Sequence, residues 1–172
     1  DIIATLNSVQ PNNWTAFFRR RVEMVRPRAT IQGLENAGWP LTYDDRRSDY
    51  WTADEDHNKS TDLTLSIGMV VKSEGVVDDV EIGGPAQKGG LAPGVKITSV
   101  NGRSFSPSAL REAVSNSVAS GDPIEVVAKD GDYSNTYSIE YHGGEKYPHL
   151  DRQPGKTDMF RAIGQPHADS AP

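Results

Sequence analysis

The chain has 172 residues, of which 35% are hydrophobic and 24% charged, and its formal net charge is −6. This length and composition are typical of a globular protein with one ordinary domain and a smaller appendage, and they exclude a fibrous or disordered chain. The acidic balance argues against a nucleic-acid partner, the absence of cysteine excludes disulfides and thiol catalysis, and no apolar run approaches the roughly 20 residues that span a bilayer.

The first forty residues are predicted to be helical. Between Asn13 and Val25, apolar residues recur at steps of three and four, and Pro27 lies beyond the last of them. A shorter helix is expected over 31–37, where Gly38 would end it. The chain begins at Asp1 and not at Met, so we expect a fragment of a longer protein.

From Trp39 onward, strand patterns dominate. Strand-like runs occupy 39–43, 63–72, 76–82, 95–100, 124–129 and 136–141. Residues 44–62 are rich in charge and poor in aliphatic side chains, which predicts a long mobile loop with Tyr50 and Trp51 as its anchors. The last stretch, 142–172, is predicted to run over the surface as a tail.

One helix is predicted among the strands, with Ser106 as its cap and Pro107 in its first turn. Gly121 would end it. Its expected apolar face consists of Leu110, Ala113, Val114 and Val118.

The stretch GGPAQKGGLAPGVKITSVNGR, residues 83–103, is rich in glycine. A phosphate-binding loop needs a lysine and a hydroxyl residue after its second glycine, but Gly89 is followed by Gly90. The pattern instead predicts one helical turn over 85–91, a strand, and a type I′ turn at Asn101-Gly102. These glycines therefore serve backbone geometry.

This order of a short helix, GLAPGVKITSVNGR and a capped helix resembles the PDZ domain, over roughly residues 63–141. The family's carboxylate-binding loop is matched by Ser66-Ile67-Gly68-Met69, with serine in place of the first glycine. The resemblance implies an α+β fold: a partly open antiparallel β-barrel or sandwich of five to six strands, with one long and one short helix. A helical arm would precede it.

The flanks DIIATLNSVQPNNWTAFFRRRVE, GLENAGWPLTYDD and YHGGEKYPHLDR are similar to the C-terminal part of bacterial glycyl aminopeptidase-type metallopeptidases, which are gluzincins. This resemblance implies an arm over 1–38 that ends the parent catalytic domain. A PDZ domain over 39–141, with a charged loop at 44–62, and a tail over 142–172 would follow. It also favours a periplasmic or secreted location.

The zinc motif of that family requires two histidines one helical turn apart with a glutamate between them. The four histidines, His57, His142, His149 and His167, are scattered. We therefore expect no cofactor and no enzymatic activity in this chain, with zinc confined to the missing catalytic domain. The run Asp54-Glu55-Asp56-His57 is interpreted as a solvated charge cluster.

The resemblance implies that an extended ligand adds a strand beside Ile67–Lys72, with its terminal carboxylate on the amides of Ile67, Gly68 and Met69. Counting along the helix places Val114 in a solvent-facing pocket wall and Arg111 at its rim, where it would favour an acidic ligand residue. The predicted peptide-binding set is Ser66, Ile67, Gly68, Met69, Val70, Val71, Arg111 and Val114.

Two partners remain open at this point. The ligand is either a peptide or protein C-terminus, or a segment of the parent enzyme. In the second case the domain would be structural or regulatory, docking within the metallopeptidase and gating its active site.

Overall fold

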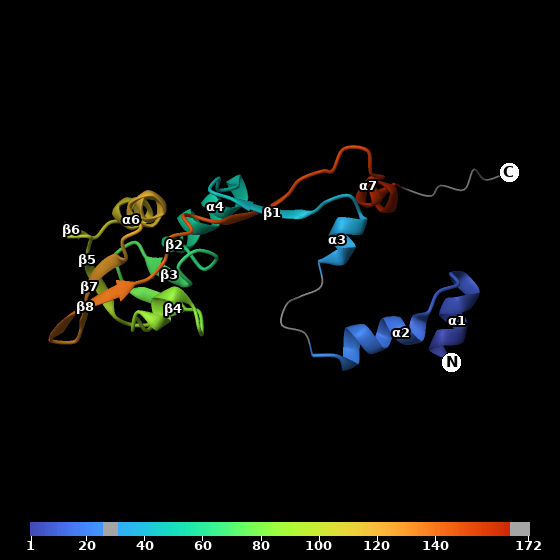
Figure 1. Ribbon diagram of the computed structural model, residues 1–172, viewed down its shortest axis with the longest axis horizontal. Coiled ribbons are helices and arrows are strands. Elements are labelled where there is room, and N and C mark those ends of the chain that lie inside the picture. The colour runs from blue at the N-terminus through green and yellow to red at the C-terminus, as the bar shows by residue number, and fades with distance from the viewer. Residues whose placement is uncertain (26–30, 166–172) are drawn as a thin grey trace. The chain divides into compact units, whose positions relative to one another are not determined.

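The computed structural model describes residues 1–25 and 31–165 (Figure 1). The chain divides into two compact units, one formed by Asp1–Gly38 with Lys156–Pro172 and the other by Trp39–Gly155. The second unit reaches beyond the predicted domain end at residue 141.

The first unit is helical. Its elements are α1 (Ile2–Val9), α2 (Trp14–Phe18), the π-helical turn η1 (Arg19–Glu23), α3 (Gln32–Asn36) and α7 (Met159–Gly164). The side chain of Asn13 caps α2 by accepting from the amide of Ala16. The helix continues only to Glu23, and Pro27 lies outside the described residues. None of the residues in these helices is buried.

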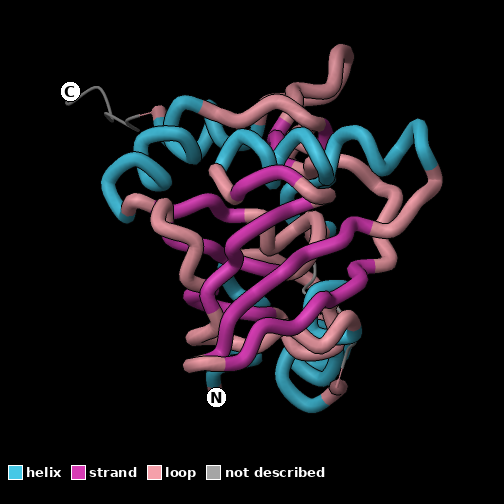
Figure 2. The backbone as a smooth tube through the Cα atoms, turned by 90° about the vertical axis from the view of Figure 1, so that its left-hand side faces the viewer, coloured by secondary structure: helices cyan, strands magenta, loops and turns pink. Residues whose placement is uncertain are grey.

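The second unit holds all nine strands of the described chain in three sheets. The strands are β1 (Leu41–Asp44), β2 (Ser60–Asp62), β3 (Met69–Lys72), β4 (Val77–Val80), β5 (Lys96–Val100), β6 (Arg103–Ser104), β7 (Ile124–Asp130), β8 (Tyr133–Ile139) and β9 (Tyr147–Leu150). The sheet orders are β1-β9, β2-β3-β4 and β6-β5-β7-β8, and every pairing is antiparallel. Figure 2 shows the strands lying side by side. No sheet closes into a barrel.

The core lies between these sheets and α6 (Pro107–Ser120). As predicted, the hydroxyl of Ser106 caps α6 by accepting from the amide of Ala109, and Gly121 ends it with φ +68°. The expected inward position of Val118 is wrong, because Val118 is 59% exposed. Ser117 is buried in the same turn, where its hydroxyl donates to the carbonyl of Val114 and is thereby satisfied.

The short helix α5 (Pro85–Lys88) and the turn at Asn101-Gly102 also form as predicted. Both turn residues have positive φ, 46° and 73°, which is the backbone that a type I′ hairpin turn requires.

The prediction of a mobile loop over 44–62 is wrong. This segment forms α4 (Asp49–Asn58) and β2, and Ser48 caps the helix by accepting from the amide of Trp51. The ring of Trp51 packs edge-on against that of Tyr147 with centroids 5.4 Å apart, whereas Tyr50, the other expected anchor, is 79% exposed. The sequence pattern missed α4 because it has no apolar stripe, and its one buried residue is charged: Glu55.

The predicted surface tail also folds in part. β9 pairs with β1 over Leu41–Asp44, and Tyr147 is 1% exposed. A single buried aromatic ring in a segment poor in aliphatic residues is sufficient to anchor it, because an aromatic side chain buries a large apolar area.

Candidate functional site

Both edges of β3 carry a partner strand. On one side β4 pairs with it, so that Met69 faces Val80. On the other side β2 pairs with it, so that Thr61 faces Val71 and Asp62 faces Val70. The edge on which the sequence analysis places an added ligand strand is therefore occupied by the chain's own residues.

The hydrogen bonds at the end of β2 involve the predicted carboxylate loop. The amide of Leu63 donates to the carbonyl of Met69 at 2.9 Å, and the carbonyl of Leu63 accepts from the amides of Ser66 and Gly68, both at 3.0 Å. Gly68 has φ +72°, a left-handed conformation in which glycine is favoured. The loop thus presents amides to an acceptor, and here that acceptor is a backbone carbonyl.

Apolar side chains of the predicted pocket belong to the buried core. Ile67, Met69 and Val114, which the sequence analysis places around a ligand pocket, are all members of the one hydrophobic core cluster. Leu63 belongs to the same cluster and is 1% exposed. The predicted solvent-facing wall is wrong, since Val114 is 0% exposed with Leu63 in the cluster.

The remaining predicted residues surround the same strand. Ser66 is buried and its hydroxyl accepts from the amide of Lys146 at 3.0 Å. Val71 is buried, whereas Val70 is half-buried.

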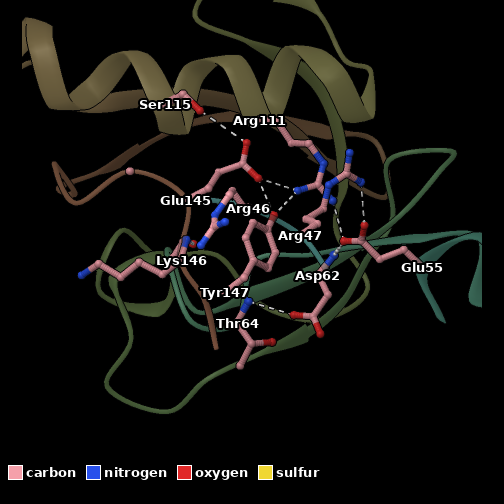
Figure 3. Close-up of polar contacts among 12 residues, drawn as sticks. Arg46, Arg47, Glu55, Asp62, Thr64, Arg111, Ser115, Glu145, Lys146 and Tyr147 are labelled. Carbon is pink, nitrogen blue, oxygen red and sulfur yellow. Dashed lines mark hydrogen bonds and ion pairs between the residues drawn. The ribbon is translucent and has the colours of Figure 1, made fainter. Parts of the chain in front are cut away.

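Arg111 lies in a network of charged groups and not at an open rim (Figure 3). Its guanidinium donates to Glu55 at 2.5 Å and to Glu145 at 2.6 Å, and it also bonds the hydroxyl of Tyr147. Only 14% of its side chain is exposed. The prediction of a free cation that selects an acidic ligand residue is therefore wrong, because the chain supplies the acidic partners itself.

Glu55 connects this network to β2. One carboxylate oxygen, Oε1, accepts from Arg111 and from the amide of Asp62, the latter at 2.8 Å, and Oε2 accepts from Arg47 at 3.0 Å. Two guanidinium groups and two carboxylates balance in charge, so the buried Glu55 is compensated.

The pKa values of this cluster reflect its burial. Burial disfavours the charge of Arg111, but Tyr147, Glu55 and Glu145 together raise its pKa above the usual value. Burial, together with the hydrogen bond to Glu145, also raises the pKa of Tyr147. Both groups therefore keep their neutral-pH protonation states, with arginine charged and tyrosine neutral.

Sequence reasoning missed Glu55 and Leu63 as residues of this site. Glu55 stood in a charge run, and its burial depends on α4, which the pattern did not predict. Leu63 was placed at the start of a continuous strand over 63–72, although residues 64–67 form a turn between β2 and β3. The available signal was Thr64, whose amide bonds the side chain of Asp62 in the manner of an Asx turn.

Further features bound the chemistry of the chain. Across residues 1–25 and 31–165, no three His, Cys, Asp or Glu side chains gather closely enough to hold a metal ion; His167 lies outside these ranges. No helix of the described part has the length and apolarity needed to cross a membrane.

Comparisons with known proteins identify the central part of the second unit. Residues 54–129 match the family model of the PDZ domain. No curated protein matches the chain. Among solved structures, the PDZ domain of HtrA3 bound to a phage-derived ligand (FGRWV) is similar, with a TM-score of 0.33 and 18% identity over 74% of this chain and 98% of that chain. The family match, together with the loop, the β3 strand and the capped α6, identifies residues 54–129 as a PDZ domain, a non-catalytic binding module.

Proposed function

We propose that this PDZ domain binds extended peptide segments, including protein C-termini, by adding them as a strand to β3. The observation that carries the proposal is the pairing of β2 with β3 and the seating of Leu63 in the loop. β2 pairs with β3, the carbonyl oxygen of Leu63 accepts from the loop amides, and the side chain of Leu63 is buried. A bound peptide would supply the same three parts: a strand, an acceptor oxygen and an apolar side chain.

A peptide library with free C-termini, selected against the full chain, tests this function. We expect enrichment of peptides with an aliphatic last residue, because Leu63, which a ligand's last residue would replace, is buried in the apolar core cluster. The proposal fails if no peptide is enriched either by the native chain or by a variant whose β2 strand has been loosened.

A second candidate function is structural or regulatory: the groove holds a segment of its own polypeptide and orders the parent protein. The occupied edge of β3 favours this reading. Enrichment of peptides by the library would count against it, whereas a folded chain that enriches none would support it.

We also infer that the chain belongs to a bacterial metallopeptidase of the glycyl aminopeptidase type, in a periplasmic or secreted location. The three flanking stretches quoted above support this parentage. The catalytic zinc would then lie in another part of that protein. Zinc titration of the chain by calorimetry should detect no stoichiometric binding, and a tight site lost on substitution of any histidine would contradict the inference.

A further inference from the structure

The segment Ser60–Leu63 lies where a bound peptide would end. Its last residue, Leu63, is 1% exposed in the core, and Thr61, two residues earlier, is 2% exposed. Thr61 lines a small pocket of ≈ 220 Å³ together with Pro107 and Arg111 from the start of α6. The segment therefore pairs with β3 and lies beside the start of α6.

We propose that Ser60–Leu63 is a built-in ligand of β3, which fills the groove between β3 and α6 and competes there with any peptide bound in trans. The inference rests on the proposed peptide-binding function and identifies its internal competitor.

The side chain between Thr61 and Leu63 is less buried than either neighbour. Asp62 is half-buried and its side chain accepts from the amide of Thr64 within the turn. A free peptide has no such turn after its last residue, so we expect this ligand position to tolerate many side chains.

A free C-terminus has one advantage over the internal segment. The carbonyl of Leu63 is neutral, whereas a terminal carboxylate would receive charge-assisted hydrogen bonds from the same amides of Ser66 and Gly68. The same peptide with an amidated end loses this advantage, which provides a matched control.

The elements around the internal ligand are short or weakly buried. α4, which precedes it, has Glu55 as its one buried residue, and β2 has only three residues. The indole N–H of Trp51 is buried without a hydrogen-bond partner, so displacing α4 would let that donor reach water. Besides the backbone hydrogen bonds to β3 and its loop, Glu55, which bonds both the amide of Asp62 and Arg111, is the main side-chain attachment.

The first experiment opens the groove. Thr61→Pro removes a backbone donor from β2 and disfavours strand pairing. The matched control is Thr42→Pro in β1, which pairs with β9 and not with β3. The probe is a fluorescent peptide ending in Ser-Thr-Asp-Leu with a free carboxylate, measured by polarisation, beside its amidated form.

We expect Thr61→Pro to bind the probe at least about tenfold more tightly than the native chain, because the internal competitor no longer reduces the fraction of open groove. Thr42→Pro should bind like the native chain, and amidation should weaken binding. Equal affinity of the native chain and Thr61→Pro overturns the inference but leaves peptide binding standing. Failure of every variant with every library peptide overturns the proposed function as well.

A second experiment covers the case in which Thr61→Pro does not fold. The amide of Leu63 bonds the carbonyl of Met69, which makes Asp62 and Val70 the close, non-hydrogen-bonded pair of the ladder, with Cα atoms about 4.5 Å apart. This separation suits a disulfide, and the chain has no other cysteine. Asp62→Cys combined with Val70→Cys should bind the probe only after reduction; equal binding by the oxidised form contradicts the inference.

Discussion

α4 and α6 meet at the ion pair of Glu55 and Arg111, but they are held in different ways. α6 buries five residues against the core, whereas α4 buries one, the charged Glu55. Both helices have a serine N-cap and a left-handed C-cap residue. The comparison teaches that α6 is part of the hydrophobic core, while α4 is attached to the domain mainly by a polar cluster.

The largest effect is expected where the two helices join. Arg111→Met leaves the half-buried Glu145 without its cation and the buried Glu55 with Arg47 alone, and should lower the free energy of unfolding by about 3–5 kcal/mol. Urea denaturation measures the change. The control is Arg103→Met, whose ion pair with Glu112 is exposed and whose loss should cost at most about 1 kcal/mol. Equal losses in the two variants would show that the cluster is not a structural connection.

The next effect probes α6 alone. Leu110 is 0% exposed, so Leu110→Ala should lower the free energy of unfolding by about 2–5 kcal/mol, because apolar burial is lost and a cavity is left. Val118→Ala, at a position 59% exposed on the same helix, should change the stability by less than about 0.5 kcal/mol. A similar cost at both positions would contradict the assignment of the buried face.

The caps sharpen the comparison further. Ser106→Ala and Ser48→Ala each remove a cap and should each destabilise their helix by about 1 kcal/mol. We expect the first change to lower global stability in denaturant titration. The second should act locally and speed amide exchange within α4 while the amides of α6 stay unaffected. Global destabilisation by Ser48→Ala would mean that α4 unfolds only with the core.

The smallest change in the free energy of unfolding at neutral pH is expected for a substitution of Tyr147. Its folded pKa is raised, so the unfolded chain loses this proton near the ordinary value of 10.0 while the folded chain keeps it. The stabilisation is therefore present below pH 10 and is lost as the pH rises above it. Tyr147→Phe should flatten the fall in unfolding free energy above that pH. An unchanged slope would contradict the raised pKa.

The elements that the sequence predicted share a local signal. The cap at Ser106, the turn at Asn101-Gly102 and the left-handed Gly121 each follow from one or two residues whose chemistry requires that backbone. Gly68, in the segment matched to a carboxylate-binding loop, also has a left-handed backbone conformation. Such features need no knowledge of distant contacts.

The parts that escaped prediction depend on long-range partners. Glu55 is buried because it pairs with Arg111, a residue 56 positions away in the sequence. β9 forms because β1 provides the strand with which it pairs. Val114 was taken for a groove wall because the pattern gave no indication that Leu63 lies in the same buried cluster. The burial of Leu63 in the core was thus the missing information.

Amide hydrogen exchange of the free chain, followed by NMR, tests the central claim most directly. The amides of Asp62, Leu63 and Gly68 donate to Glu55, Met69 and Leu63 respectively. If β2 occupies the groove, all three should be protected without any added peptide, and saturating free-carboxylate peptide should expose Asp62 and Leu63 while Gly68 stays protected. Unprotected exchange at all three in the free chain would show an open groove and contradict the account.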